Sequence, residues 1–166
     1  MTLKHAWPVS LRDVRPRDLP LLFKFHSDKE SNRLGGFIPR NKRDFFAHWK
    51  KVLADKSNLK MAILLDGEVA GYLVCFVRVA PKREVGYWVA RKHWGKGLAT
   101  TALDLFLKAY APRPLYARVS KTNAGSLKVV QRCGFRAIGE DKYSNAAGTE
   151  IEEYILKLRG RGGLRA

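Results

Sequence analysis

The chain has few cysteines, few acidic residues and no long apolar run. Its 166 residues include 2 cysteines, Cys75 and Cys133, and 15 acidic residues against 32 lysines and arginines. Both cysteines fall inside apolar patterns, which predicts reduced, buried thiols rather than a disulfide or a metal site. No apolar segment is long enough to cross a bilayer, and the first residues lack the apolar core of a signal peptide. We therefore expect a cytoplasmic protein without a metal and without a membrane partner.

The shortage of acidic residues leaves a formal net charge of +17. Such a surface attracts anions, and nucleic acid, acidic proteins and a phosphorylated cofactor are the main classes. A basic surface that is only solvated explains the charge equally well. The charge therefore bears on partners and does not bear on the fold.

Length and a hydrophobic fraction of 46% fit one globular domain with its own core. We assign residues 1–158 to this domain and the glycine- and arginine-rich residues 159–166 to a flexible basic tail. Apolar periodicity and turn signals predict a mixed α/β domain with the order β-α-α-β-β-β-α-β-α-β-β. The expected strands are residues 9–16, a hairpin over 59–79, and residues 83–90, 114–120, 135–143 and 149–158. The expected helices are residues 17–28, 43–55, 97–111 and 123–134.

Several short signals predict local detail. The pair Asp66-Gly67 is typical of a two-residue hairpin turn. Asn41 and Asp44 are alternative capping residues for the helix that follows them. Residues 31–42, SNRLGGFIPRNK, are expected to form a glycine-containing loop.

The stretch WVARKHWGKGLATTAL, residues 88–103, joins a strand directly to a helix through two glycines. Gly95 and Gly97 permit positive φ and close approach of a ligand to the backbone. The first N–H groups of the helix and the positive end of its dipole then favour an anion, and a pyrophosphate fits this chemistry. Arg91, Lys92, His93 and Lys96 add basic side chains. A tight connection without a ligand is the alternative.

Two common phosphate motifs do not fit this junction. A Rossmann site needs a third glycine where Thr100 stands, and no acidic residue follows Asp104 before Glu140. A Walker loop needs Ser or Thr after the lysine, but Gly97 follows Lys96.

WGKGLAT, with EVGYWV before it and NAGSLKVVQRCGF after it, resembles the GNAT acetyltransferases, and among them the ribosomal-protein N-terminal (RimJ/RimL-like) branch. The similarity covers roughly residues 8–158. Trp94 occupies the position where the superfamily pattern has Arg or Gln. The backbone contacts of the motif to the pyrophosphate are still expected here, but the contact from an Arg or Gln side chain is not. The resemblance implies a single-domain, mostly antiparallel mixed sheet with splayed fourth and fifth strands. It also implies acetyl-CoA as the donor.

The resemblance further assigns a binding role to the junction and its surroundings. The diphosphate would lie on the backbone N–H groups of residues 95–100, and the pantetheine arm would pair with the backbone near Trp88 and Val89. A β-bulge in the fourth strand would free an N–H near Val89 to polarise the thioester carbonyl. The implied cofactor-binding residues are Trp88, Val89, Lys92, Trp94, Gly95, Lys96, Gly97, Leu98, Ala99, Thr100, Asn123 and Ser126.

Two residues are candidates for proton transfer. Glu84 matches the glutamate that many GNAT enzymes use as base, and pairing with Arg83 or Lys82 is the structural alternative. Many relatives have a tyrosine that acts as the general acid at the position where this chain has Val130. Ser126 is the family-like substitute at the thioester sulfur, and hydrogen bonding at the helix N-terminus is its alternative role.

Three further residues have weaker or combined roles. Tyr143 and Tyr154 are weaker candidates for the acid. Asn123 is expected to cap the short helix and also to hold the pantetheine amide.

The resemblance favours a protein N-terminal α-amine as acceptor, with small-molecule amines as the second class. The acidic residues Glu140, Asp141, Glu150, Glu152 and Glu153 could attract a cationic amine or could simply pair with nearby Lys and Arg. The segment RLGGFIP could cover the acceptor pocket. A CoA- or RNA-binding module without catalysis is a third class, and the charge suggests proximity to the ribosome. We expect a monomer or a weak homodimer.

Overall fold

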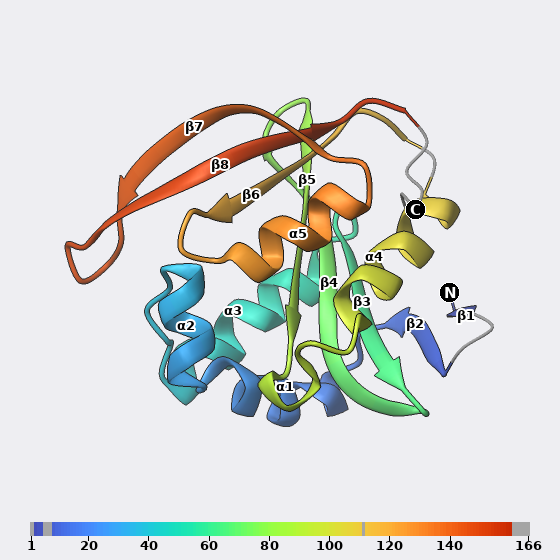
Figure 1. The fold of residues 1–166 in the computed structure, drawn as a ribbon. Helices are drawn as coiled ribbons and strands as arrows, with labels where there is room; N and C mark the ends of the chain where they lie inside the picture. Colours follow the sequence, from blue (N-terminus) through green and yellow to red (C-terminus); the bar gives the residue numbers. More distant parts are fainter. Residues whose placement is uncertain (1, 5–7, 111, 161–166) are drawn as a thin grey trace.

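The computed structural model describes residues 2–4, 8–110 and 112–160, so most of the expected basic tail lies outside the described residues. One sheet runs through the molecule in the order β1-β2-β3-β4-β5-β6-β8-β7 (Figure 1). Its strands are β1 (Thr2–Lys4), β2 (Val9–Asp13), β3 (Leu59–Leu65), β4 (Glu68–Val79), β5 (Lys82–Val89), β6 (Leu115–Ser120), β7 (Arg136–Ser144) and β8 (Glu150–Leu158). The helices are η1 (Pro16–Asp18), α1 (Leu19–His26), α2 (Lys29–Gly35), α3 (Lys42–Ala54), η2 (Arg91–His93), α4 (Leu98–Ala109) and α5 (Ala124–Arg132).

The central feature of the sheet is the divergence of β5 and β6. These two strands are parallel and pair only at Arg83 with Leu115 and at Glu84 with Tyr116. The other neighbouring strands pair antiparallel. Figure 1 shows β6, β8 and β7 crossing above β5 and turning away from it. The expected mostly antiparallel sheet with splayed fourth and fifth strands is therefore confirmed.

Side chains alternate across β5 and join two separate cores. Tyr87 packs against the larger core, which α4 and α5 cover, whereas Trp88 belongs to the core under α1 and α3. Successive residues of a strand point to opposite faces, which is why neighbours in sequence reach different cores. Cys75 and Cys133 are buried free thiols in the larger core, as expected.

Two local predictions from the sequence, one hairpin turn and one helix cap, are confirmed. Asp66 and Gly67 both have positive φ, 50° and 84°, as a type I′ hairpin turn requires. The Asn41 side chain accepts a hydrogen bond from the N–H of Asp44 at 2.9 Å, so Asn41 is the cap of α3.

Two elements differ from the expectation. Residues 29–35 form α2 where a loop is predicted, because Asp28 caps the helix at the N–H of Ser31 and Gly36, at φ 72°, ends it. The glycines thus end a short helix instead of forming a long loop. Strand β1 is an addition at the edge of the sheet, where it pairs with β2.

None of the described helices has the length and apolar character needed to cross a membrane.

Candidate active site

A cavity of about 1240 Å³ lies where β5 and β6 separate. Glu84 to Trp88 of β5 and Ala117 to Ser120 of β6 form its walls. From one face of the sheet come Ser126 of α5 and Asn123, the N-cap of that helix. The other walls come from α1–α3, the segment after α2, and the β7–β8 hairpin, including His26, Asn32, Phe37, Phe45, Asp141 and Tyr143. The cavity therefore joins the two faces of the sheet through the gap between diverging strands.

The glycine junction has the geometry that the motif predicts. Gly95 and Gly97 have φ 73° and 74°, and no heavy atom lies within 4 Å of the position of a Cβ at either residue. Gly97 is the N-cap of α4, and no side chain caps this helix end. The first N–H groups of α4, from Leu98 to Thr100, have no partner within the helix and carry the positive end of its dipole.

Trp94 is held by the strand that precedes it. Its indole Nε1 donates a hydrogen bond to the carbonyl oxygen of Val89 at 2.9 Å, although the side chain is 39% exposed. This hydrogen bond stabilises the turn between β5 and α4, which gives a structural reason for an indole at this position of the motif.

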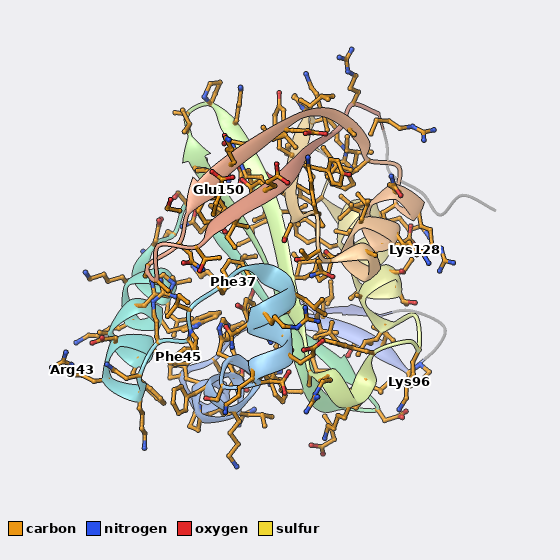
Figure 2. The ribbon with its side chains drawn as sticks, turned by 60° about the vertical axis from the view of Figure 1, so that its left-hand side comes forward. Phe37, Arg43, Phe45, Lys96, Lys128 and Glu150 are labelled. Carbon is orange, nitrogen blue, oxygen red and sulfur yellow. The ribbon has the colours of Figure 1, made fainter. Side chains whose placement is uncertain are left out.

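The basic residues around the junction differ in whether they are exposed or form an ion pair. Lys92 and Lys96 are exposed, and Lys96 lies on the side of α4 and α5 in Figure 2, away from Phe45 on α3. Arg91 instead pairs with Asp28, the cap of α2, at 3.1 Å. Burial and the nearby Lys92 and Lys96 lower the pKa of His93, so this imidazole is neutral at pH 7.

The expected bulge in β5 near Val89 is not where the sequence placed it. The register of β4 with β5 is continuous from Gly71 and Val89 to Val77 and Arg83. Both irregularities of this region are in β4, one next to Gly71 and one between Val77 and Val79. The two strands also approach closely here, since a Cβ on Gly71 would lie 2.2 Å from the carbonyl oxygen of Trp88, so this position requires glycine.

At the start of α5, Ser126 has a partner that the sequence did not suggest. Its Oγ lies 2.7 Å from the hydroxyl of Tyr87, which also donates to the Ser126 carbonyl oxygen at 3.2 Å. Burial raises the pKa of Tyr87, so this phenol stays protonated. Asn123 caps α5 through a bond from the N–H of Ser126 at 3.1 Å, as expected, and Val130 is buried against the cavity.

Glu84 lies on the cavity wall and is 7% exposed, and both of its carboxylate oxygens accept hydrogen bonds. Arg78 Nε donates to one carboxylate oxygen at 2.7 Å, and Arg118 Nε donates to the other at 3.2 Å. The expected alternative partners, Arg83 and Lys82, are not the ones used. Both carboxylate oxygens of Glu84 thus accept hydrogen bonds from guanidinium groups.

Arg118 is the centre of the acidic group on the β7–β8 side. It also donates to Asp141 at 2.9 Å and to Glu153 at 2.7 Å, and these bonds raise its pKa further. Lys121 pairs with Glu140 at 2.6 Å, and Lys142 lies 3.7 Å from Glu150. Four of the five acidic residues of this region, all but Glu152, are thus paired with basic side chains.

The cavity wall formed by α1–α3 and β5 is aromatic. His26 stacks on Trp88 with ring centroids 4.1 Å apart, and its Nε2 lies 2.6 Å from the hydroxyl of Tyr72. Burial lowers the pKa of His26 to about 4, so it is neutral at pH 7. Phe37 from the segment after α2 reaches the same indole, with centroids 5.9 Å apart, and lies between α2 and the β7–β8 hairpin in Figure 2.

Residues 9–136 match the family model described as an acetyltransferase (GNAT) domain. The chain belongs to the GNAT acetyltransferase family. It is 34% identical to "Putative ribosomal N-acetyltransferase YdaF" of Bacillus subtilis, over 95% of this chain and 96% of that protein. It is 24% identical to "Uncharacterized N-acetyltransferase p20" of Bacillus licheniformis, over 92% and 93% of the two chains.

Solved structures agree with this family. Mycobacterium smegmatis RimJ, solved in complex with a CoA-disulfide, superposes with a TM-score of 0.76 at 26% identity, covering 96% of this chain and 87% of that one. The fold also matches RimL, a ribosomal L7/L12 α-N-protein acetyltransferase, with a TM-score of 0.81 at 17% identity, covering 96% and 94%. These relatives support the RimJ/RimL-like branch, and the chain is an acyltransferase.

In this GNAT acetyltransferase the structure brings four of the predicted residues, Glu84, Trp88, Asn123 and Ser126, into the lining of one cavity. Lys92 to Thr100 form the turn and the helix start after β5 and are not among the lining residues. Tyr154 is not among the residues that line the cavity, whereas Tyr143 is. Tyr87, Arg118, His26 and Asn32 were missed, because each owes its position to partners distant in sequence.

Proposed function

We propose that this enzyme transfers the acetyl group of acetyl-CoA directly to the α-amine of a protein or peptide N-terminus. The opening between β5 and β6 supports a direct transfer, because it lets a donor on the α4–α5 face meet an acceptor on the α1–α3 face. Relatives of this chain include a RimJ solved with a CoA-disulfide and a protein named as a ribosomal N-acetyltransferase.

For the donor we propose the residues that the motif indicates. The diphosphate lies on the first N–H groups of α4, next to Gly95, Gly97 and the side chains of Lys92 and Lys96. The pantetheine arm follows the free edge of β5 beside Trp88 and Val89, and Asn123 holds one of its amides. Leu98, Ala99 and Thr100 contribute backbone N–H groups, and Trp94 supports the turn through its bond to Val89.

In the chemical step the amine nitrogen attacks the thioester carbon, the C–N bond forms and the C–S bond breaks. The departing thiolate takes a proton from the Ser126 hydroxyl, which Tyr87 orients and resupplies through its own hydrogen bond. The proton lost by the amine leaves through water to Glu84. One proton leaves the nitrogen for Glu84 and one reaches the sulfur from Ser126, and exchange with water then returns the proton of Tyr87 and the carboxylate of Glu84.

The observation that carries the choice of an α-amine is the pairing of Glu84 with Arg78 and Arg118. With both of its oxygens already bonded to guanidinium groups, Glu84 is poorly placed to remove a proton from a charged ammonium group, so an amine that is already neutral suits the site. An α-amine, with a pKa of about 7.7–8.0, is roughly one-tenth neutral at pH 7, but an alkylamine of pKa about 10.4 is neutral at only about one part in 2,500. Once a neutral amine has attacked, the adduct is acidic enough for a weak base to accept its proton.

The first test is titration calorimetry of acetyl-CoA into the protein, with NADH and ATP as controls. We expect micromolar binding of acetyl-CoA alone. An acceptor panel at pH 7 then compares peptides with free N-termini against polyamines and other small amines. Acetylation of the small amines but of no peptide would replace the proposal with a small-molecule acetyltransferase.

The variant Glu84→Gln tests the catalytic assignment. We expect turnover to fall by about 100-fold or more while the Kd for acetyl-CoA stays the same. Binding of acetyl-CoA without turnover in the wild type, with any acceptor, would indicate a CoA-binding module that lacks catalysis.

Ribosomal proteins are the acceptor class that we propose within this function. The name of the Bacillus subtilis relative and the net charge of +17 both support it, because a basic enzyme concentrates near ribosomal RNA. The test is binding to ribosomal RNA at physiological salt, with a neutral domain of the same family as control. Equal affinity of the two proteins would contradict this part of the proposal.

A further inference from the structure

The charged side chains that line the cavity are not all paired with one another. The acidic ones each lie within ion-pair distance of an arginine, and they are Asp44, Glu84, Asp141 and Glu153. Two basic side chains of the lining, Arg40 and Lys60, pair with no carboxylate among the described residues. The acceptor side of the cavity therefore carries positive charge that the described part of the chain does not offset.

Arg40 lies beside the aromatic wall of the cavity. It belongs to the segment between α2 and α3, and it is exposed and lines the cavity. Burial lowers the pKa values of His26 and His48, and the charge of Arg40 lowers both further. Burial raises the pKa of Tyr72, and Arg40 acts in the opposite direction there. These three side chains also line the cavity, so the guanidinium group faces the same space as they do.

The segment that carries Arg40 is fixed at both ends. Before it, the backbone N–H of Phe37 donates to the carbonyl oxygen of Asn32 at 2.9 Å. After it, the Asn41 side chain accepts from the N–H of Asp44 at 2.9 Å and so caps α3. The backbone of Arg40 is thus held between two helices, which gives its charge a constant place at the cavity.

Lys60 gives the distance of this charge from the transfer site. It lies opposite Val74 of β4, which lies opposite Gly86 of β5, and all three line the cavity. Its Nζ donates to the carbonyl oxygen of Asp55 at 2.6 Å and has two further N–H groups. Adjacent strands are about 4.8 Å apart, so Lys60 is roughly 10 Å across the sheet from β5. An extended peptide spans about 3.3–3.6 Å per residue, so its second or third residue covers this distance.

We propose that Arg40 and Lys60 form a carboxylate subsite that selects peptide acceptors with Asp or Glu as the second or third residue. This inference rests on the proposed transfer to an N-terminal α-amine and narrows the class of peptide that is acetylated. The guanidinium group of Arg40 offers two parallel N–H groups to a carboxylate, and Lys60 adds a second positive charge. The same charges repel an acceptor with lysine at these positions, so attraction and repulsion both contribute to selectivity.

The test uses acceptor peptides that are identical except for Glu, Gln or Lys at the second or third residue. For the wild type we expect kcat/KM to be about fivefold to tenfold higher with Glu than with Gln at the better of the two positions. In Arg40→Gln this ratio should fall to about twofold or less. Lys60→Gln should lower the ratio by a smaller factor, because its Nζ is partly occupied by Asp55.

Lys42→Gln is the matched control. Lys42 has the same charge as Arg40 and is exposed two residues away, but it is not among the residues that line the cavity. It should leave the ratio unchanged. An equal fall in Lys42→Gln would show that only the net charge of the protein matters, and this result would overturn the subsite. A wild type that acetylates the Glu and Gln peptides equally well would also overturn it and would leave the proposed function standing. Absence of acetylation with every peptide would instead refute the proposed function.

The charge reversal Arg40→Glu gives a result that a misfolded variant cannot imitate. We expect this variant to acetylate the Lys peptide with a higher kcat/KM than the Glu peptide, which is the reverse of the wild-type order. The absolute kcat/KM for the Lys peptide should also rise above its wild-type value. A variant that still prefers the Glu peptide would contradict the assignment of Arg40.

Discussion

The two faces of β5 are built in different ways. On the α4–α5 face the residues that we propose for the donor come from one continuous stretch, from Trp88 through Gly97 into α4, with Ser126 added by α5. On the α1–α3 face, where we propose that the acceptor binds, the cavity is lined by Asn32, His26 and Arg118 from distant parts of the chain. The first set takes its geometry from neighbours in sequence, whereas the second is assembled by tertiary contacts.

The largest effect should come from Arg118, which joins three acidic groups on the acceptor face. Arg118→Met leaves Glu84 and Glu153 without this partner in a largely buried position, and we expect a loss of about 3–5 kcal/mol in the free energy of unfolding. Urea denaturation measures it. The control is Arg78→Met, because Arg78 is 51% exposed and bonds only Glu84, so its loss should be far smaller. Equal losses would show that Arg118 does not organise this face.

The second effect concerns pH and His26. Its pKa is about 4 in the folded protein and about 6.5 when unfolded, because burial among Phe45, Tyr72 and Trp88 disfavours the charged ring, as do Arg40 and His48. The unfolded state binds the proton first, so stability is complete above pH 6.5 and falls as the pH drops toward 4.

Linkage gives a loss from this group of up to about 3 kcal/mol. His26→Phe should flatten the pH dependence of unfolding between pH 6.5 and 4. His93→Gln, on the donor face, should change it much less. An unchanged curve for His26→Phe would contradict the assignment.

The third effect separates two hydroxyl groups on the donor face. Ser126→Ala removes the proposed acid and should lower kcat by about 100-fold, a much larger factor than its effect on the Kd for acetyl-CoA. Tyr87→Phe removes only the hydroxyl that orients Ser126, and a loss of about tenfold is expected. A larger loss for Tyr87→Phe than for Ser126→Ala would identify the tyrosine itself as the acid. Steady-state kinetics at saturating peptide measures both.

The smallest effect tests the glycine junction. Gly97→Ala forces a side chain into φ 74°, at a cost of roughly 1–2 kcal/mol, and should weaken acetyl-CoA binding by about tenfold in calorimetry. Gly67→Ala is the matched control, since Gly67 has φ 84° and equally open surroundings but lies in the β3–β4 turn. It should lower stability similarly and leave the affinity for acetyl-CoA unchanged.

The same contrast explains what the sequence could predict. The order of most elements, the hairpin turn at Asp66-Gly67, the Asn41 and Asn123 caps and the glycine junction all follow from neighbours within a few residues. Helix α2 was missed because Gly35 and Gly36 suggested a loop, although Asp28 supplies a cap.

The charge network could not be predicted because its partners are far apart in sequence. Arg118 and Glu84 are separated by 34 positions and meet only where β6 approaches β5. Likewise, Tyr87 reaches Ser126 over 39 positions, through the packing of α5 on the sheet. No periodicity or motif carries such information.

The short pairing of β5 with β6 leaves most of one edge of β5 without a neighbouring strand. If the proposed donor lies along this edge, its binding energy adds to the stability of the fold, because a ligand that binds only the folded state stabilises it. At a ligand concentration of about 100 times Kd, this linkage contributes roughly 2.7 kcal/mol. The free enzyme should therefore unfold more readily than the donor-bound enzyme.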